Sequence, residues 1–170
     1  MQRFCYFIIL IFVTAFNQIV AQSGPDLPQR NAVVRATQVL NFGDMTILSG
    51  SSGGTVTVDF NGVRTSTGSV ILLNLGNPVQ QAIFEVKICP GRMVNVTFPS
   101  TTVLSGNNGG TMLLHLGPTS IGGSGSSFIS NKGCDDLHFV RVGGTIDVGA
   151  MGTNPAGLYS GTFNLTFVQQ

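Results

Sequence analysis

The C-terminal stretch Tyr159-Ser160-Gly161-Thr162-Phe163-Asn164-Leu165-Thr166-Phe167 decides the fold class of this 170-residue chain. Its odd-numbered positions carry aromatic, aliphatic or glycine residues, and its even-numbered positions carry only Ser, Thr or Asn. Successive side chains of a β-strand point to opposite faces, so this alternation predicts a strand with one buried face and one solvated face.

The same period of two recurs upstream, whereas no segment has the 3.6-residue period of a helix. Alternating stretches lie at 55–60, 84–88, 94–98, 112–116 and 140–148. In the last of these, Gly143-Gly144 leaves open whether the chain forms one bent strand or a tight pair. Clusters of Gly, Asn, Ser and Pro separate the stretches, which predicts about eight or nine strands in an antiparallel sandwich or barrel.

Two further segments carry strand signals of a different kind. The continuous apolar run 70–75 predicts a strand that is covered on both faces. Near the N-terminus an apolar face, interrupted only at Gln38, is formed by Ala32, Val34, Ala36, Leu40 and Phe42.

The composition excludes several classes of protein. Only 9% of the residues are charged and the formal net charge is +1, so no basic surface for nucleic acid is expected. Glycine is abundant, at 23 residues, but it follows no three-residue period, which excludes collagen. A hydrophobic share of 42% favours a compact domain over a disordered chain.

The first 21 residues have the pattern of an export signal. Arg3 precedes an apolar run from Tyr6 to Phe16 that is short for a bilayer span, and the expected cleavage point follows Ala21. The alternative is a short N-terminal membrane anchor. We therefore expect a signal peptide (1–21), a flexible N-terminal leader (22–31) and a single folded domain (32–170), exported and without stable membrane insertion.

Removal of the signal takes Cys5 with it and leaves two cysteines, Cys89 and Cys134. An even pair in an oxidising compartment predicts a disulfide. The bridge would close a loop of about 45 residues and stabilise the fold by roughly 4 kcal/mol in the chain-entropy model. A metal pair and two free thiols are the alternatives.

Two motifs resemble parts of catalytic or metal sites. Gly50-Ser51-Ser52-Gly53-Gly54 matches G-x-S-x-G, but a nucleophile elbow needs a helix after the turn, and a strand is predicted here. Cys134-Asp135-Asp136-Leu137-His138 contains side chains that ligate metals. Cys134 is expected in the disulfide, however, and the other histidine, His115, is distant in sequence. A loop that leads into a strand is the simpler interpretation of this cluster.

Carboxylates for glycoside cleavage would have to converge from different strands. The candidates Asp59, Glu85 and Asp147 each fall on the polar phase of a predicted strand, where a solvated role is expected. We therefore expect no enzyme activity, no catalytic or cofactor-binding residue, and no metal site.

Four segments, in order along the chain, carry a family resemblance: Leu40-Asn41-Phe42-Gly43, Gly54–Val58, Val142–Val148 and Gly157–Phe167. Together they resemble the secreted bacterial family known as domain of unknown function 4402, over roughly Ala32 to Val168. The V-G-G-T strand followed by the G-x-Y-S-G-T-F ending is the more specific part of the pattern.

The resemblance implies an exported bacterial β-sandwich, similar to fimbrial or pilin-like subunits, with no established enzymatic activity. It supplies no catalytic or ligand residue, and the Cys89 and Cys134 pair departs from its pattern. With it, the expected fold becomes an all-β, antiparallel, immunoglobulin-like or pilin-like sandwich of about eight or nine strands. The expected location is outside the cytoplasm: secreted, on the cell surface, or in the periplasm of a bacterium.

Two functions follow as hypotheses. In the first, the chain is a structural subunit whose apolar strand near the N-terminus, Ala32 to Phe42, adds to the sheet edge of a like subunit or another surface protein. That strand could equally complete its own sandwich. In the second, the chain is a monomeric module that binds a glycan or a protein through loops such as 117–127. The absence of Trp from the sequence disfavours a sugar-stacking platform.

Overall fold

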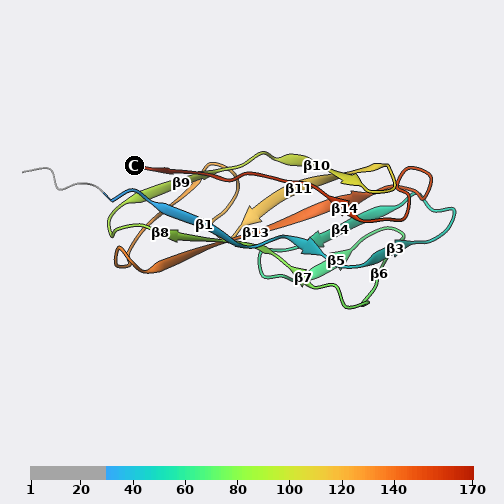
Figure 1. Cartoon of the computed structure of the whole chain (residues 1–170), viewed down its shortest axis with the longest axis horizontal. Helices are drawn as coiled ribbons and strands as arrows, with labels where there is room; N and C mark the ends of the chain where they lie inside the picture. The colour runs from blue at the N-terminus through green and yellow to red at the C-terminus, as the bar shows by residue number, and fades with distance from the viewer. Residues whose placement is uncertain (1–29) are drawn as a thin grey trace, which may run out of the picture.

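The computed structural model describes residues 30–170, and every regular element in that range is a β-strand. The predicted signal peptide and nearly all of the predicted leader lie outside the described residues. The molecule is elongated, and most strands run along its long axis (Figure 1). The prediction of an all-β, antiparallel fold is confirmed, although the fifteen strands exceed the eight or nine expected because several are only two to four residues long.

The larger sheet has eight strands in the order β1-β8-β13-β11-β10-β14, with β4 paired to β13 and β5 paired to β4. All its pairings are antiparallel. Its strands are β1 (Val33–Gln38), β4 (Gly54–Val58), β5 (Arg64–Ser66), β8 (Ala82–Lys87), β10 (Thr101–Gly106), β11 (Thr111–Thr119), β13 (Leu137–Val148) and β14 (Tyr159–Ser160).

A smaller sheet of three strands covers one end of the larger sheet. Its order is β12 (Ser126–Ile129), β9 (Met93–Thr97) and β15 (Thr166–Gln169). The rings of Phe84 on β8 and Phe167 on β15 lie 5.9 Å apart between centroids, so β15 packs over β8. Two short pairs complete the structure: β2 (Asn41–Phe42) with β7 (Val79–Gln80), and β3 (Met45–Ile47) with β6 (Val70–Leu72).

Strand β13 connects the two halves of the large sheet because its partner strand changes along its length. Its first half pairs with β8, and its second half pairs with β4 on that side and with β11 on the other. The change occurs at Gly143 and Gly144, where a Cβ on Gly143 would lie 2.6 Å from the Val58 carbonyl oxygen. These glycines therefore mark a close approach inside one continuous strand, not a tight pair of strands.

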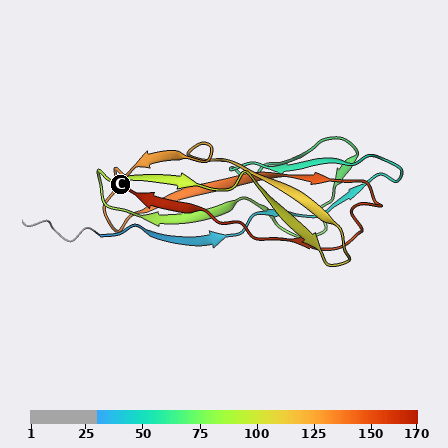
Figure 2. The same cartoon turned by 90° about the horizontal axis from the view of Figure 1, so that it is seen from above.

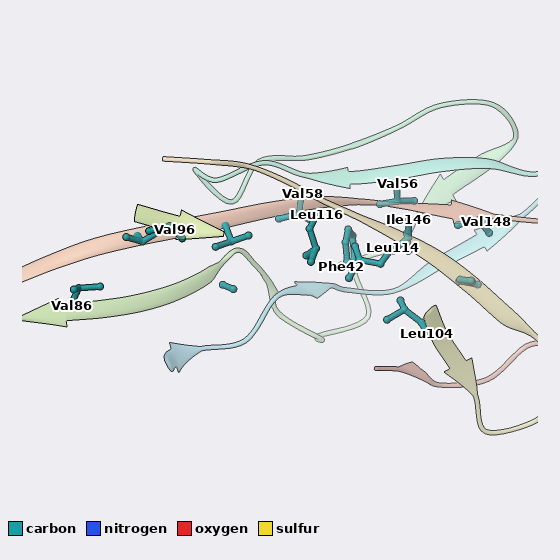
Figure 3. Packing of buried hydrophobic residues seen from close by; sticks show 14 of the residues in the cluster. Phe42, Val56, Val58, Val86, Val96, Leu104, Leu114, Leu116, Ile146 and Val148 are labelled. Atoms are coloured by element: carbon teal, nitrogen blue, oxygen red, sulfur yellow. The ribbon is translucent and has the colours of Figure 1, made fainter. Parts of the chain in front are cut away.

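The core lies between the sheets and follows the alternation seen in the sequence. Figure 3 shows Phe42 with Leu114, Leu116 and Ile146 in this interior. The side chains with no exposed surface are mostly valines, on β4, β8, β9 and β13: Val56, Val58, Val86, Val94, Val96 and Val142. Each of these side chains stabilises the fold by the apolar surface that it removes from water, at about 25 cal/mol per Å².

Two strand predictions were wrong in extent. The stretch 159–167 forms β14 and β15 on different sheets, because residues 161–165 cross between the sheets while Phe163 and Leu165 still pack against the core. In the run 70–75 only Val70–Leu72 is a strand, and Ile71 is 43% exposed. Val70 is buried and Ile71 is exposed, so the strand has one solvent-facing side and is not covered on both faces as predicted.

Candidate functional site

The N-terminal strand β1 is paired with its neighbour but is scarcely buried. Among residues 30–170 it pairs with β8 alone, at the end of the large sheet, and none of these residues pairs with its other edge (Figure 2). Val34 and Ala36 lie opposite Val86 and Phe84 and so share their core-facing side. All residues from Val33 to Thr37 are nevertheless exposed. Main-chain hydrogen bonds, rather than apolar burial, hold this strand.

Side chains tie β1 at both ends. At its start, the Ala32 N–H donates to Gln169 Oε1 at 2.7 Å, and Arg30 forms an exposed ion pair with Asp135 at 3.2 Å. At its end, Gln38 Nε2 donates to the Gln81 carbonyl at 2.6 Å. An exposed ion pair contributes at most about 1 kcal/mol, so these ties are weak beside a buried strand.

An apolar groove of about 590 Å³ opens in the other half of the large sheet. Its floor consists of core side chains from β10, β11 and β13: Leu104, Met112, Leu114, Ile146 and Val148. Its two walls are the segment 40–47, which contains β2 and β3, and the segment 155–163, which contains β14. These segments are far apart in the sequence.

The first wall is fixed by one arginine. The Arg64 guanidinium donates to the carbonyls of Phe42 at 2.9 Å, Asp44 at 3.0 Å and Leu73 at 2.8 Å. Three carbonyls from two segments are thus bound by one planar cation, a geometry that suits arginine and not lysine. Nothing in the local sequence around Arg64 distinguishes it from a solvated residue in a hairpin.

The second wall is fixed by side-chain amides. Asn154 is buried and its Nδ2 donates to the Thr111 carbonyl at 2.6 Å. Asn107 Oδ1 accepts from the Leu158 N–H at 2.9 Å, and Asn108 Nδ2 donates to the Ala156 carbonyl at 2.8 Å. Tyr159 donates its hydroxyl to the Pro155 carbonyl at 2.8 Å. The groove is therefore preformed between two held walls.

One polar atom in the groove lining has no hydrogen bond. Asp44 Oδ1 accepts from Asn77 Nδ2 at 2.6 Å, but Asp44 Oδ2 is buried without a partner, alone among buried side-chain oxygens and nitrogens of residues 30–170. An unpaired buried acceptor costs about 1–3 kcal/mol.

The G-x-S-x-G motif forms a turn and a loop. Its serine, Ser52, is exposed in the loop before β4, and that strand, not a helix, follows. The neighbouring Ser51 donates its hydroxyl to the Leu48 carbonyl at 2.7 Å. The nucleophile elbow needs the helix to present its serine, so this match has no catalytic context.

The cluster 134–138 is likewise used for structure. Cys134 is bonded to Cys89, Asp136 accepts from the Gly133 N–H at 3.0 Å, and His138 Nε2 lies 2.9 Å from the hydroxyl of buried Ser130. Partial burial, helped by the charge of Lys132, lowers the pKa of His138 below its usual 6.5.

The three candidate carboxylates are not brought together. Asp59 caps a turn, and the hydrogen bond from the Val63 N–H at 2.8 Å is the main cause of its lowered pKa. Asp147 Oδ2 lies 2.8 Å from His115 Nε2 on the outer face of the large sheet. Glu85 lies opposite Arg35 and Phe139 in the strand register.

Residues 30–170 contain no group of three His, Cys, Asp or Glu side chains placed to hold a metal ion. Within the same residues, no helix is long and apolar enough to cross a membrane. The groove could not be predicted from the sequence because its two walls come from opposite ends of the chain. The only local indication was the apolar face near the N-terminus, whose last residues, Leu40 and Phe42, belong to the first wall.

No curated protein and no solved structure matches this chain significantly. A family model described as Domain of unknown function (DUF4402) matches residues 33–168, from the first residue of β1 into β15. The match spans nearly all of the described residues. The chain therefore belongs to the DUF4402 family.

Proposed function

We propose that this chain is an exported, non-catalytic structural subunit of the bacterial surface, a fimbrial, pilin-like or matrix protein that assembles by β-strand pairing. Its partners are like subunits or other surface proteins, and no cofactor takes part. The observation that carries this proposal is the state of β1, an edge strand with five consecutive exposed residues.

An edge strand with free N–H and C=O groups is a template for pairing with another chain. Soluble proteins usually protect such edges with charges, prolines or bulges. Within β1, Arg35 is the one charged residue, and the single register shift lies between Ala36 and Gln38. Its first four residues therefore form a mostly apolar strand that can pair with the sheet edge of another chain by main-chain hydrogen bonds.

Two further features support export and a structural role. The Cys89–Cys134 disulfide is of the kind that persists in oxidising compartments. Of the side chains that resembled parts of catalytic or metal sites, Ser52 is exposed in the loop before β4, and His138 lies 2.9 Å from the hydroxyl of buried Ser130.

Size-exclusion chromatography, electron microscopy and gels of unheated samples test the proposal on purified residues 22–170. We expect filaments, or a ladder of oligomers that collapses to monomer only on heating. A single monomeric peak at high concentration, unchanged when surface proteins of the same cell are added, would contradict it.

A further inference from the structure

We propose that the groove between β3 and β14 is an acceptor site for the β1 strand of a second copy of this chain. The inference rests on the proposed function, since it names the surface that receives the assembling strand. It adds the site, its occupant and the geometry of the resulting polymer.

The groove lies between two edge strands that belong to different sheets. Among residues 30–170, β3 pairs only with β6 and β14 pairs only with β10, so each wall has one side unpaired. The floor between them is apolar core, from Leu104 to Val148. An extended chain placed here would pair with backbone on its sides and bury alternate side chains against the floor.

The chemistry of the lining selects a neutral, apolar strand. Asp44 is the one acidic or basic side chain among the residues that line the groove. On the rim, Leu75 and Leu158 are 74% and 71% exposed and would be covered by a bound chain.

The β1 strand matches the apolar lining of this site in its pattern of side chains. Val34 and Ala36 lie on one phase and are apolar and small, whereas Arg35 lies on the other phase and would point to solvent. Six extended residues span about 20 Å. Because β1 buries so little in its own sheet, its release from β8 loses few apolar contacts.

A second copy must supply the strand. For the chain's own β1 to enter the groove, the chain would have to reverse its direction at Val39-Leu40, which is unfavourable. Leu40 is itself part of the first wall, and only Val39 separates it from the end of β1. A two-residue reversal requires Gly, Asn or Asp, so Val39-Leu40 is a poor turn.

The ends of the molecule also fit head-to-tail assembly. The start of β1 lies toward the end of the molecule that carries the C-terminus, whereas β3 and β6 lie toward the opposite end (Figure 1). A strand donated from one end to a groove in the other half makes a heterologous contact, which propagates into an open linear polymer.

The test uses a fluorescent synthetic peptide of residues 31–38, titrated into the monomeric fraction of the purified chain 22–170 and followed by fluorescence anisotropy. We expect saturable binding that Leu158→Lys on the groove rim weakens at least about tenfold. The matched control is Val63→Lys, at a 57% exposed position outside the groove, which should leave the affinity unchanged. Two variant peptides test the phase: Ala36→Asp should abolish binding, and Arg35→Asp should not.

A photo-crosslinker in the peptide then locates it. Crosslinks within 40–47 or 155–163 support the acceptor site. Crosslinks to 82–87 would mean that the peptide replaces β1 beside β8, and would overturn it, as would no saturable binding at about 1 mM. Filaments without groove binding would refute the acceptor site alone; groove binding without assembly would refute the proposed function alone.

Discussion

Val34 lies directly opposite Val86 where β1 pairs with β8, yet Val34 is 38% exposed and Val86 is completely buried. The hydrophobic core therefore ends at β8, and β1 is an extension of the sheet beyond the core. A strand in this position is held by main-chain pairing but buries little apolar surface, so its release would cost little apolar burial.

Alanine at these two positions should have unequal effects. Val86→Ala leaves a cavity in the core and should lower the free energy of unfolding by about 2–3 kcal/mol. Val34→Ala removes a half-exposed side chain and should cost about 0.5 kcal/mol or less. Urea denaturation of both variants measures the difference; equal losses would mean that β1 is part of the core.

Arg64 should be irreplaceable by lysine. A single ammonium cannot reach the carbonyls of Phe42, Asp44 and Leu73 together, so Arg64→Lys should lower the free energy of unfolding by about 1–2 kcal/mol. Arg141→Lys, at an exposed position on β13, is the matched control and should be neutral. If the two variants unfold at the same urea concentration, the three hydrogen bonds of Arg64 do not stabilise the first wall of the groove.

The disulfide should contribute strongly to stability. Cys89 and Cys134 are separated by 45 positions in the sequence, and the loop that they close contains β9, β10, β11 and β12. Replacement of both by serine should cost about 2–4 kcal/mol, mainly because the unfolded chain becomes freer. Thermal unfolding with and without reductant checks this: reductant should lower the Tm of the native chain and leave that of the double variant unchanged.

His138 should make the fold sensitive to mild acid. Its pKa is lower in the folded chain than the ordinary 6.5, so the unfolded chain binds the proton more tightly. The contribution of neutral His138 to the free energy of unfolding is complete above pH 6.5. It is lost as the pH falls below 6.5 through the pKa of His138 in the folded chain. Urea midpoints at a series of pH values should fall more steeply below 6.5 for the native chain than for His138→Gln. Parallel curves would contradict this origin.

The sequence predicts those features that depend on local alternation or on simple counting. Val56, Val58, Val94 and Val96 are in the core because their neighbours are polar and the period is two. The cysteine pair followed from an even count of cysteines after the predicted signal peptide, in a chain that the sequence predicts to be exported. These inferences need no knowledge of which strands are adjacent.

Features that depend on tertiary register could not be predicted. His115 meets Asp147 only because β11 and β13 pair with Leu113 opposite Asp147. Arg64 reaches three carbonyls only after two distant segments converge. The break in 159–167 arises because the chain changes sheets there, while its alternating pattern continues.

The central claim is that the chain assembles through β1, and removal of that strand tests it most directly. The deletion should run from residue 22 to Gln38, because Leu40 and Phe42 belong to the groove wall and the core. We expect the truncated chain to unfold cooperatively and to keep its β-sheet circular dichroism, but to form neither filaments nor heat-sensitive oligomers. Undiminished assembly by the folded, truncated chain would contradict the account.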